Sequence, residues 1–560
     1  MRSLILTLVL TIFASDLSTS AAVYEVGPGQ QITNIAGVPW ATLQPGDIVR
    51  IHWRTEPYRE KWVICRQGTA ELPITVVGVP GPEGQRPVID GVNATTPANL
   101  NFWSEQRGVI KIGGANVPAD TMPRHIIIEG LEVRGAHPNY QFTGRNGTVQ
   151  SYASAASPIF IEKGEFITIR NNIITDGANG LFAASTDSAQ SRDILVEGNY
   201  IHGNGIVGSI YQHNNYTAAI NITFQYNRFG PLRSGSPGVN LKDRSAGLVV
   251  RYNWIEGGNR TIDMVDGEDT AVIRNHPAYR KTFVYGNILI KQDGGNNQVV
   301  HYGGDSGTTA NYRKGKLYLY GNTIYSVRAS TTVIARLSTN DENADLRNNI
   351  FFNTSSGANL AMLAEAGTLL LANNWAKTGW RNSHEGGGFT GSVTGGNTMV
   401  TGTSPGFADI NAQNFALLPG SPAIDAGTAL NPDVLPLNDL SRQYLIHQRS
   451  TARPQVGQFD LGAFEYSALL PPVINTETLP PALRLRPYDQ SLQITGGIAP
   501  FEFSIAEGGV PPGLRLDVSS GRIFGRPRLR GTWVFTIRVT DSQGQTAERA
   551  FTLSSILSPH

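Results

Sequence analysis

A short hydrophobic pattern recurs along the middle of the chain. Apolar, β-branched or aromatic runs such as ILVEGNYI and LVVRYNWI each end in an asparagine that is followed by another apolar residue. Successive asparagines lie 27, 28, 26, 34, 35, 27 and 25 residues apart, and no helical pattern accompanies them. A repeat of this length predicts a solenoid whose coils of short strands stack through parallel pairing. The repeat asparagines are Asn172, Asn199, Asn227, Asn253, Asn287, Asn322, Asn349 and Asn374.

The asparagines and the uneven spacings both have a physical interpretation. Each coil must turn after its strand, and asparagine tolerates the left-handed conformation and bonds locally to the backbone. Stacked asparagines are expected to bond amide to amide along the axis, which satisfies buried polar groups. The two long spacings contain insertions at residues 257–281 and 291–316. Long irregular insertions in a compact repeat are more often functional than not.

Several segments outside the repeats resemble a known architecture. LQPGDIVRI and IIIEGLEVRG are similar to the first coils of right-handed parallel β-helix proteins, the group of pectate-lyase-like and chondroitinase-B-like enzymes. FALLPGSPAIDAGT resembles a closing coil of secreted bacterial members of that group. The resemblance implies an all-β fold with a right-handed parallel β-helix over residues 22–467. It implies little about activity, because one fold supports many chemistries.

The C-terminal part has a different pattern. A proline-rich linker is predicted at residues 468–482, and residues 483–556 then alternate strongly, with turn residues every eight to twelve positions. Such alternation is typical of a small β-sandwich. GGIAPFEFSI and GTWVFTIRVTDS resemble the Ig-like repeats of bacterial surface and secreted proteins. The resemblance implies a spacer or binding appendage.

Composition and the N-terminus indicate the class of protein. The chain has 560 residues with 45 Lys+Arg against 44 Asp+Glu, so charge gives no reason to expect nucleic acid as a partner. Arg2 precedes an apolar run and then small residues, which predicts a secretory signal at residues 1–21. No segment is long enough to span a membrane. Cys65, the single cysteine, excludes an internal disulfide and is expected to be buried.

We therefore expect an exported, extracellular monomer, with the periplasm or the cell surface as alternatives. Its expected partner is an acidic polysaccharide or another glycan.

Residues 239–244 read as a short strand that presents two cations on one face. Side chains alternate between the faces of a strand, so Lys242 and Arg244 share a face with Asn240. If Leu241 points into the core, both cations lie on the outer surface.

Counting back from the repeat asparagines places Tyr216 beside Lys242 on the neighbouring coil. Lys242 precedes Asn253 by 11 residues, and Tyr216 precedes Asn227 by the same number. The side chains expected together on this outer face are His213, Asn214, Tyr216, Asn240, Lys242 and Arg244.

This grouping suits β-elimination from a uronic-acid polysaccharide. The reaction needs a base for the proton beside the carboxylate, a cation for the carboxylate and a proton donor for the leaving oxygen. A lysine becomes a base only when its pKa falls, which a neighbouring cation promotes, and this predicts Lys242 as the base. Arg244 is predicted to clamp the carboxylate with its two-pronged guanidinium. Tyr216 or His213 is predicted to protonate the leaving group.

The following coil adds acids that could hold calcium through oxygen ligands. β-Helix lyases that this chain resembles use a lysine/arginine pair with calcium, which maps onto Lys242 and Arg244. Asn214, Asn240 and His276 are predicted to contact substrate. The predicted calcium ligands are Asp263, Asp266, Glu268 and Asp269.

Two other functions remain open from the sequence. A β-helix glycoside hydrolase could use a carboxylate pair such as Asp263 with Asp266 or Glu268, although the strings NTD, DD and GHG typical of polygalacturonases do not occur. A non-catalytic glycan-binding or adhesin-type solenoid is the alternative from a different class. In that case Lys242 and Arg244 would be ordinary solvated charges.

Overall fold

The computed structural model describes residues 21–454, 456–466, 471–497, 499–542 and 544–557. The predicted signal sequence therefore lies outside the described residues except for its last position. Within the described ranges, no helix has the length and apolar character needed to cross a bilayer. The chain divides into two compact units, residues 1–466 and 467–560, and each is described by itself.

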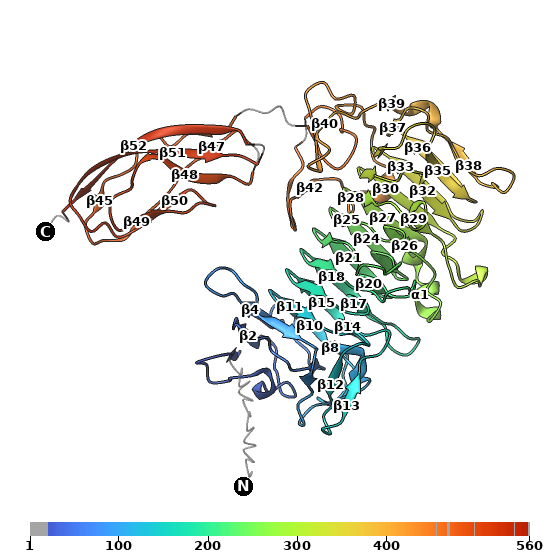
Figure 1. Ribbon diagram of the computed structural model, residues 1–560, viewed down its shortest axis with the longest axis horizontal. Coiled ribbons are helices and arrows are strands. Elements are labelled where there is room, and N and C mark those ends of the chain that lie inside the picture. Colours follow the sequence, from blue (N-terminus) through green and yellow to red (C-terminus); the bar gives the residue numbers. More distant parts are fainter. Residues whose placement is uncertain (1–20, 455, 467–470, 498, 543, 558–560) are drawn as a thin grey trace, which may run out of the picture. The chain divides into compact units, whose positions relative to one another are not determined.

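The first unit is a parallel β-helix, as the sequence predicts (Figure 1). In the repeat region each coil contributes one strand to each of three long sheets, and each strand pairs in parallel with the next coil. The thirteen-stranded sheet contains β1 (Val23–Val26), β2 (Ile48–His52), β4 (Ile74–Val79), β10 (Arg124–Glu129), β15 (Glu165–Arg170), β18 (Arg192–Glu197), β21 (Ile220–Gln225), β24 (Ala246–Arg251), β27 (Lys281–Tyr285), β30 (Lys316–Tyr320), β33 (Asn343–Arg347), β36 (Thr368–Ala372) and β38 (Ser392–Thr394).

The other two long sheets form the remaining walls. The eleven-stranded sheet contains β5 (Val88–Asp90), β11 (Glu132–Arg134), β16 (Ile173–Thr175), β19 (Tyr200–His202), β22 (Arg228–Phe229), β25 (Trp254–Glu256), β28 (Ile288–Lys291), β31 (Thr323–Ser326), β34 (Ile350–Asn353), β37 (Trp375–Lys377) and β39 (Val400–Gly402). The ten-stranded sheet contains β3 (Trp62–Ile64), β8 (Gly108–Ile112), β14 (Ser157–Ile161), β17 (Leu181–Ala183), β20 (Asn215–Thr217), β23 (Leu241–Asp243), β26 (Ile262–Met264), β29 (Gln298–Tyr302), β32 (Thr332–Leu337) and β35 (Leu360–Glu365).

The repeat asparagines form a ladder inside one corner of the coils. Each is fully buried, and each backbone N–H from Asn172 to Asn349 donates to the Oδ1 of the next asparagine, as when Asn227 N–H donates to Asn253 Oδ1 at 2.9 Å. The Nδ2 group of Asn227 donates to the same Oδ1 at 3.0 Å and to Val196 O at 2.8 Å. The predicted amide ladder is therefore confirmed.

The conformational role predicted for these asparagines is wrong by one position. The residue before each ladder asparagine has the positive φ, as at Tyr226 (φ 57°) and Tyr252 (φ 53°). The preceding residue makes the turn because the asparagine side chain must point inward along the axis to bond its neighbours.

Apolar side chains fill the interior of the solenoid, and the final part of the unit covers one side. Cys65 is buried, as predicted, and burial raises the pKa of its thiol to about 12. Residues 403–466 pack on the outer aromatic side chains: Leu440 joins Tyr252 in one apolar cluster, and Tyr252 Oη donates to Asp439 O at 2.9 Å. The aromatic residues beside the ladder therefore pack along the solenoid and do not form an open groove.

Shorter elements complete this unit. They are β6 (Ala94–Thr95), β7 (Asn101–Phe102), β9 (Ala115–Val117), β12 (Gln141–Thr143), β13 (Val149–Ser151), β40 (Phe407–Asp409), β41 (Asn414–Leu417), β42 (Arg442–Leu445), β43 (Arg449–Ala452), the helix α1 (Ala271–Asn275) and the 3₁₀ turns η1 (Ile35–Gly37), η2 (Glu105–Arg107), η3 (Pro277–Arg280), η4 (Thr309–Asn311), η5 (Gly396–Thr398) and η6 (Pro432–Val434).

The second unit is an Ig-like sandwich around an apolar core that includes Phe503, Ile523 and Phe535. The segment predicted as a linker, residues 468–482, supplies β44 and the start of β45, which pair with β47 and β52. That prediction was too long, because apolar Ile474 and Leu479 pack into the core. The strands are β44 (Val473–Ile474), β45 (Ala482–Leu483), β46 (Tyr488–Ser491), β47 (Ile494–Thr495), β48 (Glu502–Gly508), β49 (Leu514–Leu516), β50 (Arg522–Gly525), β51 (Gly531–Thr540) and β52 (Thr546–Ile556).

Candidate functional site

One outward-facing row of the ten-stranded sheet carries most of the candidate chemistry. Tyr216 on β20 pairs directly with Lys242 on β23, as counting from the repeat asparagines predicts. The inward neighbours on β23, Leu241 and Asp243, are fully buried, so Lys242 points outward. Pairing continues from coil to coil along the same row. This row, named the outer column, consists of Phe182, Tyr216, Lys242, Asp263, His301 and Arg336.

Two carboxylates hold the amine of Lys242. Its Nζ forms an ion pair with Asp305, in the loop after β29, and lies 3.6 Å from Asp263 Oδ2. The Lys242 side chain is 12% exposed and that of Asp305 27% exposed, so the pair borders solvent. Lys242 Nζ donates a hydrogen bond to Asp305, so its contacts are those of a hydrogen-bond donor.

Arg244 is fully engaged by the protein itself. Its Nε donates to Tyr216 Oη at 2.8 Å and its Nη1 donates to Asp266 O at 2.6 Å. Its Nη2 pairs with Glu268 at 2.7 Å and with Asp305 at 3.0 Å. Burial alone would lower the pKa of Arg244, but the Tyr216 oxygen and these carboxylates raise it above its ordinary value. The carboxylate clamp stays a prediction for Arg244, and this geometry gives it no support, since each guanidinium nitrogen has a protein partner and the side chain is only 5% exposed.

Tyr216 and His213 lie together next to this ion network. The two rings meet edge to face with centroids 5.4 Å apart, and the Lys242 Nζ lies 5.8 Å from the Tyr216 ring centroid. Burial and the nearby Lys242 charge lower the pKa of His213 to about 3. Its Nδ1 accepts a hydrogen bond from the Val239 N–H at 3.0 Å. His213 is therefore a neutral, buried ring that supports Tyr216, and it has no proton to give as an imidazolium.

The outer column continues into an Asp–His–Ser chain. His301 Nδ1 lies 2.6 Å from Asp263 Oδ1, and its Nε2 lies 2.8 Å from Ser338 Oγ. Burial raises the pKa of Asp263, but His301, Lys242 and Arg260 together lower it by more. Its carboxylate is therefore ionised. Burial lowers the pKa of His301 despite Asp263. An ionised carboxylate only accepts, so Nδ1 carries the imidazole proton and Nε2 is left as an acceptor.

Arg336 supplies the guanidinium of the outer column, and part of that guanidinium is free to donate hydrogen bonds. Its Nε pairs with Glu365 at 2.7 Å, and its Nη1 lies 3.3 Å from His301 Nε2. Its side chain is 24% exposed. Within the described part of the chain, Nη2 of Arg336 has no hydrogen-bond partner, so it can receive a carboxylate from solvent without breaking an existing bond.

Two predicted substrate contacts, Asn214 and Asn240, lie inside the solenoid, and the third, His276, stays a prediction. Asn214 and Asn240 are fully buried and bond to each other in a second amide ladder, with Asn214 Nδ2 donating to Asn240 Oδ1 at 2.5 Å. Their outward placement was wrong because strand alternation ends at the corner before β20 and β23. His276 caps η3, where its Nδ1 accepts the Ala278 N–H at 3.2 Å.

The four acids predicted to bind calcium do not converge on one point. Asp263 faces His301 and Lys242, whereas Asp266 Oδ1 accepts the Asp305 N–H at 2.9 Å. Glu268 pairs with Arg244, and Asp269 is exposed. Across the described residues, no group of three or more His, Cys, Asp or Glu side chains is arranged to hold a metal ion. Calcium binding stays a prediction, and this geometry gives it no support.

Sequence reasoning missed His301, Asp305, Arg336 and Ser338. The spacing between Asn287 and Asn322 is 35 residues, so counting from the ladder gives no register for the strand inside this insertion. A signal was nevertheless present in QVVHYGGD, where His301 lies between two apolar residues of an alternating run. The insertion itself had been predicted to be functional.

The comparisons with known proteins bear mainly on the second unit. The family model described as "Putative Ig domain" matches residues 471–555, which are the residues of the sandwich. The C-terminal unit is therefore an Ig-like domain. No curated protein matches the chain.

Similar solved structures share little sequence with this chain. An alginate lyase from Paenibacillus sp. is 14% identical, with a TM-score of 0.38 and coverage of 57% of this chain and 91% of that one. A lacto-N-biosidase from Eubacterium ramulus is 10% identical, with a TM-score of 0.35 and coverage of 68% and 67%. A Bacteroides fragilis protein described as a "putative alpha-galactosidase" is 20% identical, with a TM-score of 0.14; the match covers 15% of this chain and 18% of that one. The fold and the site rest on the strand pairing and contacts of this chain itself.

Proposed function

We propose that the outer column cleaves a uronic-acid polysaccharide by β-elimination. The observation that carries the proposal is the direct pairing of Tyr216 with Lys242, each held by its own charged partners. Arg244 donates to the phenolic oxygen of Tyr216, while Lys242 donates to Asp305 and lies beside Asp263. A poised base and a poised acid on adjacent coils are what elimination requires.

In the proposed step, the Tyr216 phenolate takes the proton from the carbon beside the uronate carboxylate. The electrons left on that carbon form a carbon–carbon double bond as the neighbouring glycosidic carbon–oxygen bond breaks. The leaving oxygen takes a proton from the Lys242 ammonium, and proton transfer from Tyr216 to Lys242 restores the starting state. These roles reverse those expected from the sequence, because the carboxylates around Lys242 are visible only in three dimensions.

Other uronate carboxylates of the polymer need cations along the same surface. Arg336 lies four coils from Tyr216 on the outer column, about 19 Å at the spacing of paired strands. Its partly exposed guanidinium is therefore placed for the carboxylate of another sugar unit and not for that of the reacting one. Its planar donors match a carboxylate. Arg244 acts as a positioning residue that holds the Tyr216 oxygen.

A panel of uronate polymers tests this function. Wild-type protein is expected to produce unsaturated uronate ends, measured by their ultraviolet absorbance, on at least one polymer. Lys242→Ala and Tyr216→Phe are each expected to lower the rate at least 100-fold, since a positioned acid or base contributes about 10²–10⁴-fold. Lys281→Ala, which removes an exposed lysine on β27, is the matched control and should keep the wild-type rate.

A chelator arm tests the calcium prediction in the same assay. Asp263, Asp266 and Glu268 are engaged by cations of the protein, so we expect the rate to be unchanged by EDTA.

Full activity in the Lys242→Ala and Tyr216→Phe variants would eliminate the site. Lack of absorbance on every polymer, with retained binding, would instead favour a glycan-binding solenoid.

A second candidate function is favoured by the Asp263–His301–Ser338 chain. Its distances of 2.6 and 2.8 Å are those of a serine nucleophile with an oriented general base. Ser338 Oγ would attack an acyl ester, with His301 taking its proton. Labelling by a fluorophosphonate at Ser338, abolished in Ser338→Ala, would support ester hydrolysis. If Ser338 is not labelled, the hydrogen-bonded Asp263–His301–Ser338 group has a structural role only.

A further inference from the structure

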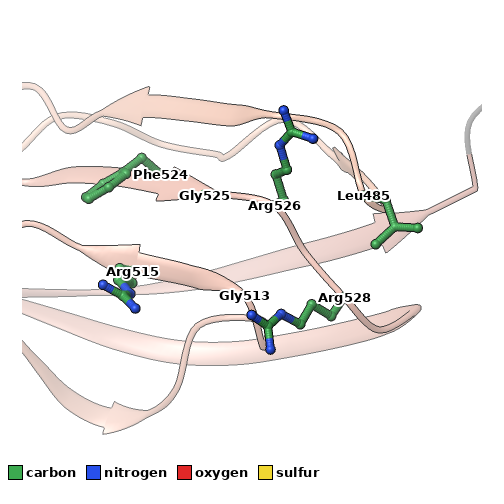
Figure 2. Close-up of a pocket in the computed structure, with 7 residues that line it drawn as sticks. All are labelled: Leu485, Gly513, Arg515, Phe524, Gly525, Arg526 and Arg528. Atoms are coloured by element: carbon green, nitrogen blue, oxygen red, sulfur yellow. The ribbon is translucent and has the colours of Figure 1, made fainter.

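A pocket in the Ig-like domain is lined by arginines. It has a volume of about 450 Å³ and lies where the residues after β45, the strand β49 and the end of β50 meet (Figure 2). Backbone hydrogen bonds hold these segments together, with Leu485 N–H donating to Pro527 O at 2.8 Å and Arg528 N–H donating to Pro512 O at 2.7 Å. The residues lining it are Leu485, Gly513, Arg515, Phe524, Gly525, Arg526 and Arg528.

Two glycines allow the backbone segments to come this close. Gly513 has φ +99°, and a Cβ there would lie 2.1 Å from Arg526 O. Gly525 has φ +132°, and a Cβ there would lie 2.3 Å from Gly513 O. Any side chain at either position would push the segments apart. Figure 2 shows that the arginines lie on the backbone segments around Gly513 and Gly525, which have no side chains.

The positive charge of the pocket is not compensated by the domain. Arg515, Arg526 and Arg528 are exposed, and among the described residues no carboxylate forms an ion pair with any of them. Other arginines of the domain are paired: Arg522 donates to Asp489 Oδ1 at 2.6 Å and Arg538 to Glu548 Oε1 at 2.7 Å. Uncompensated cations at one end of a small domain attract anions from solution.

The chemistry of the lining residues identifies the class of ligand. All nine basic residues between 471 and 555 are arginines, which favours recognition by planar guanidinium groups over general charge. A guanidinium matches the paired oxygens of a carboxylate or a sulfate. The pocket volume lies in the range of ligand sites, and Phe524 and Leu485 add apolar surface for a sugar ring.

We infer that this pocket binds an anionic polysaccharide through its carboxylate or sulfate groups. Binding here would keep the chain on a polyanionic polymer independently of any reaction at the solenoid. The inference does not depend on elimination chemistry, because it requires only that the polymer be anionic.

Two double variants of the full chain test this inference. Arg526→Gln with Arg528→Gln removes two pocket charges, and Arg522→Gln with Arg538→Gln removes two paired charges from the same domain. Both are made in the Lys242→Ala background, which prevents cleavage of the polymer if elimination occurs. Affinity is measured by titration calorimetry with polygalacturonate, with a sulfated glycan such as heparin, and with neutral dextran.

The pocket variant is expected to bind its anionic polymer about tenfold more weakly, and the paired-charge variant within about twofold of the parent. Polygalacturonate and heparin distinguish carboxylate from sulfate recognition, and dextran should not bind. Equal losses in the two double variants would overturn the inference, as would binding to duplex DNA that is equally tight and equally sensitive to the pocket substitutions. Failure of elimination would not change this comparison.

Discussion

The neutral ring of His213 shows how single residues are tuned around the outer column. Burial first, and the Lys242 charge second, lower the pKa of His213 to about 3, and its Nδ1 accepts the Val239 N–H. A protonated ring would have no acceptor for that N–H and would face the Lys242 ammonium. The unfolded chain, by contrast, takes up a proton on this histidine near pH 6.5.

The free energy of unfolding is therefore expected to fall as the pH drops from about 6.5 toward 3. In that range the unfolded state binds a proton that the folded state does not, and the loss from His213 approaches about 1.4 kcal/mol per pH unit. His213→Gln should flatten this dependence, measured by urea unfolding at several pH values. The control is His276→Gln, which removes a capping histidine outside the column. Identical pH slopes in the two variants would contradict the assigned role.

At the scale of elements, the asparagine ladder sets the corner of every repeat coil. An asparagine follows a short apolar strand in every repeat coil. Because this pattern is local, the sequence predicts both the strand and the ladder of side chains. The residue that makes the turn was harder to predict, since Tyr226 and Tyr252 take the left-handed conformation that single-residue preferences assign to asparagine or glycine. Stacking between these two rings, with centroids 5.9 Å apart, accompanies that conformation.

Asn253→Ala tests the ladder in the middle of the solenoid. The substitution leaves the backbone N–H and the Nδ2 of Asn227 without their acceptor in a dry interior. A buried unsatisfied group costs about 1–3 kcal/mol, so the two together should lower the free energy of unfolding by about 2–6 kcal/mol. Chemical denaturation measures the shift. Asn343→Ala, at an exposed position on β33, should change stability by less than about 0.5 kcal/mol, and an equally small shift in both variants would rule out the ladder as a main support.

At the scale of the whole molecule, the sequence predicted the architecture and only part of the candidate site. The β-helix and the Ig-like domain follow from periodic patterns, and the Tyr216–Lys242 pair follows from counting between coils. His301 and Asp305 reach the same surface through an insertion, where spacing carries no register, and Arg336 lies on the following coil. The partners of Lys242 and Arg244, which set their chemical roles, depend on these distant segments.

The fate of solvent oxygen tests the central claim, that the outer column cleaves its polymer by elimination. Products formed in water enriched in heavy oxygen are analysed by mass spectrometry. Elimination breaks the glycosidic bond without adding water, so the new chain ends should carry an unsaturated uronate and no heavy oxygen. One heavy oxygen incorporated at each cleaved bond would show hydrolysis and would contradict the account.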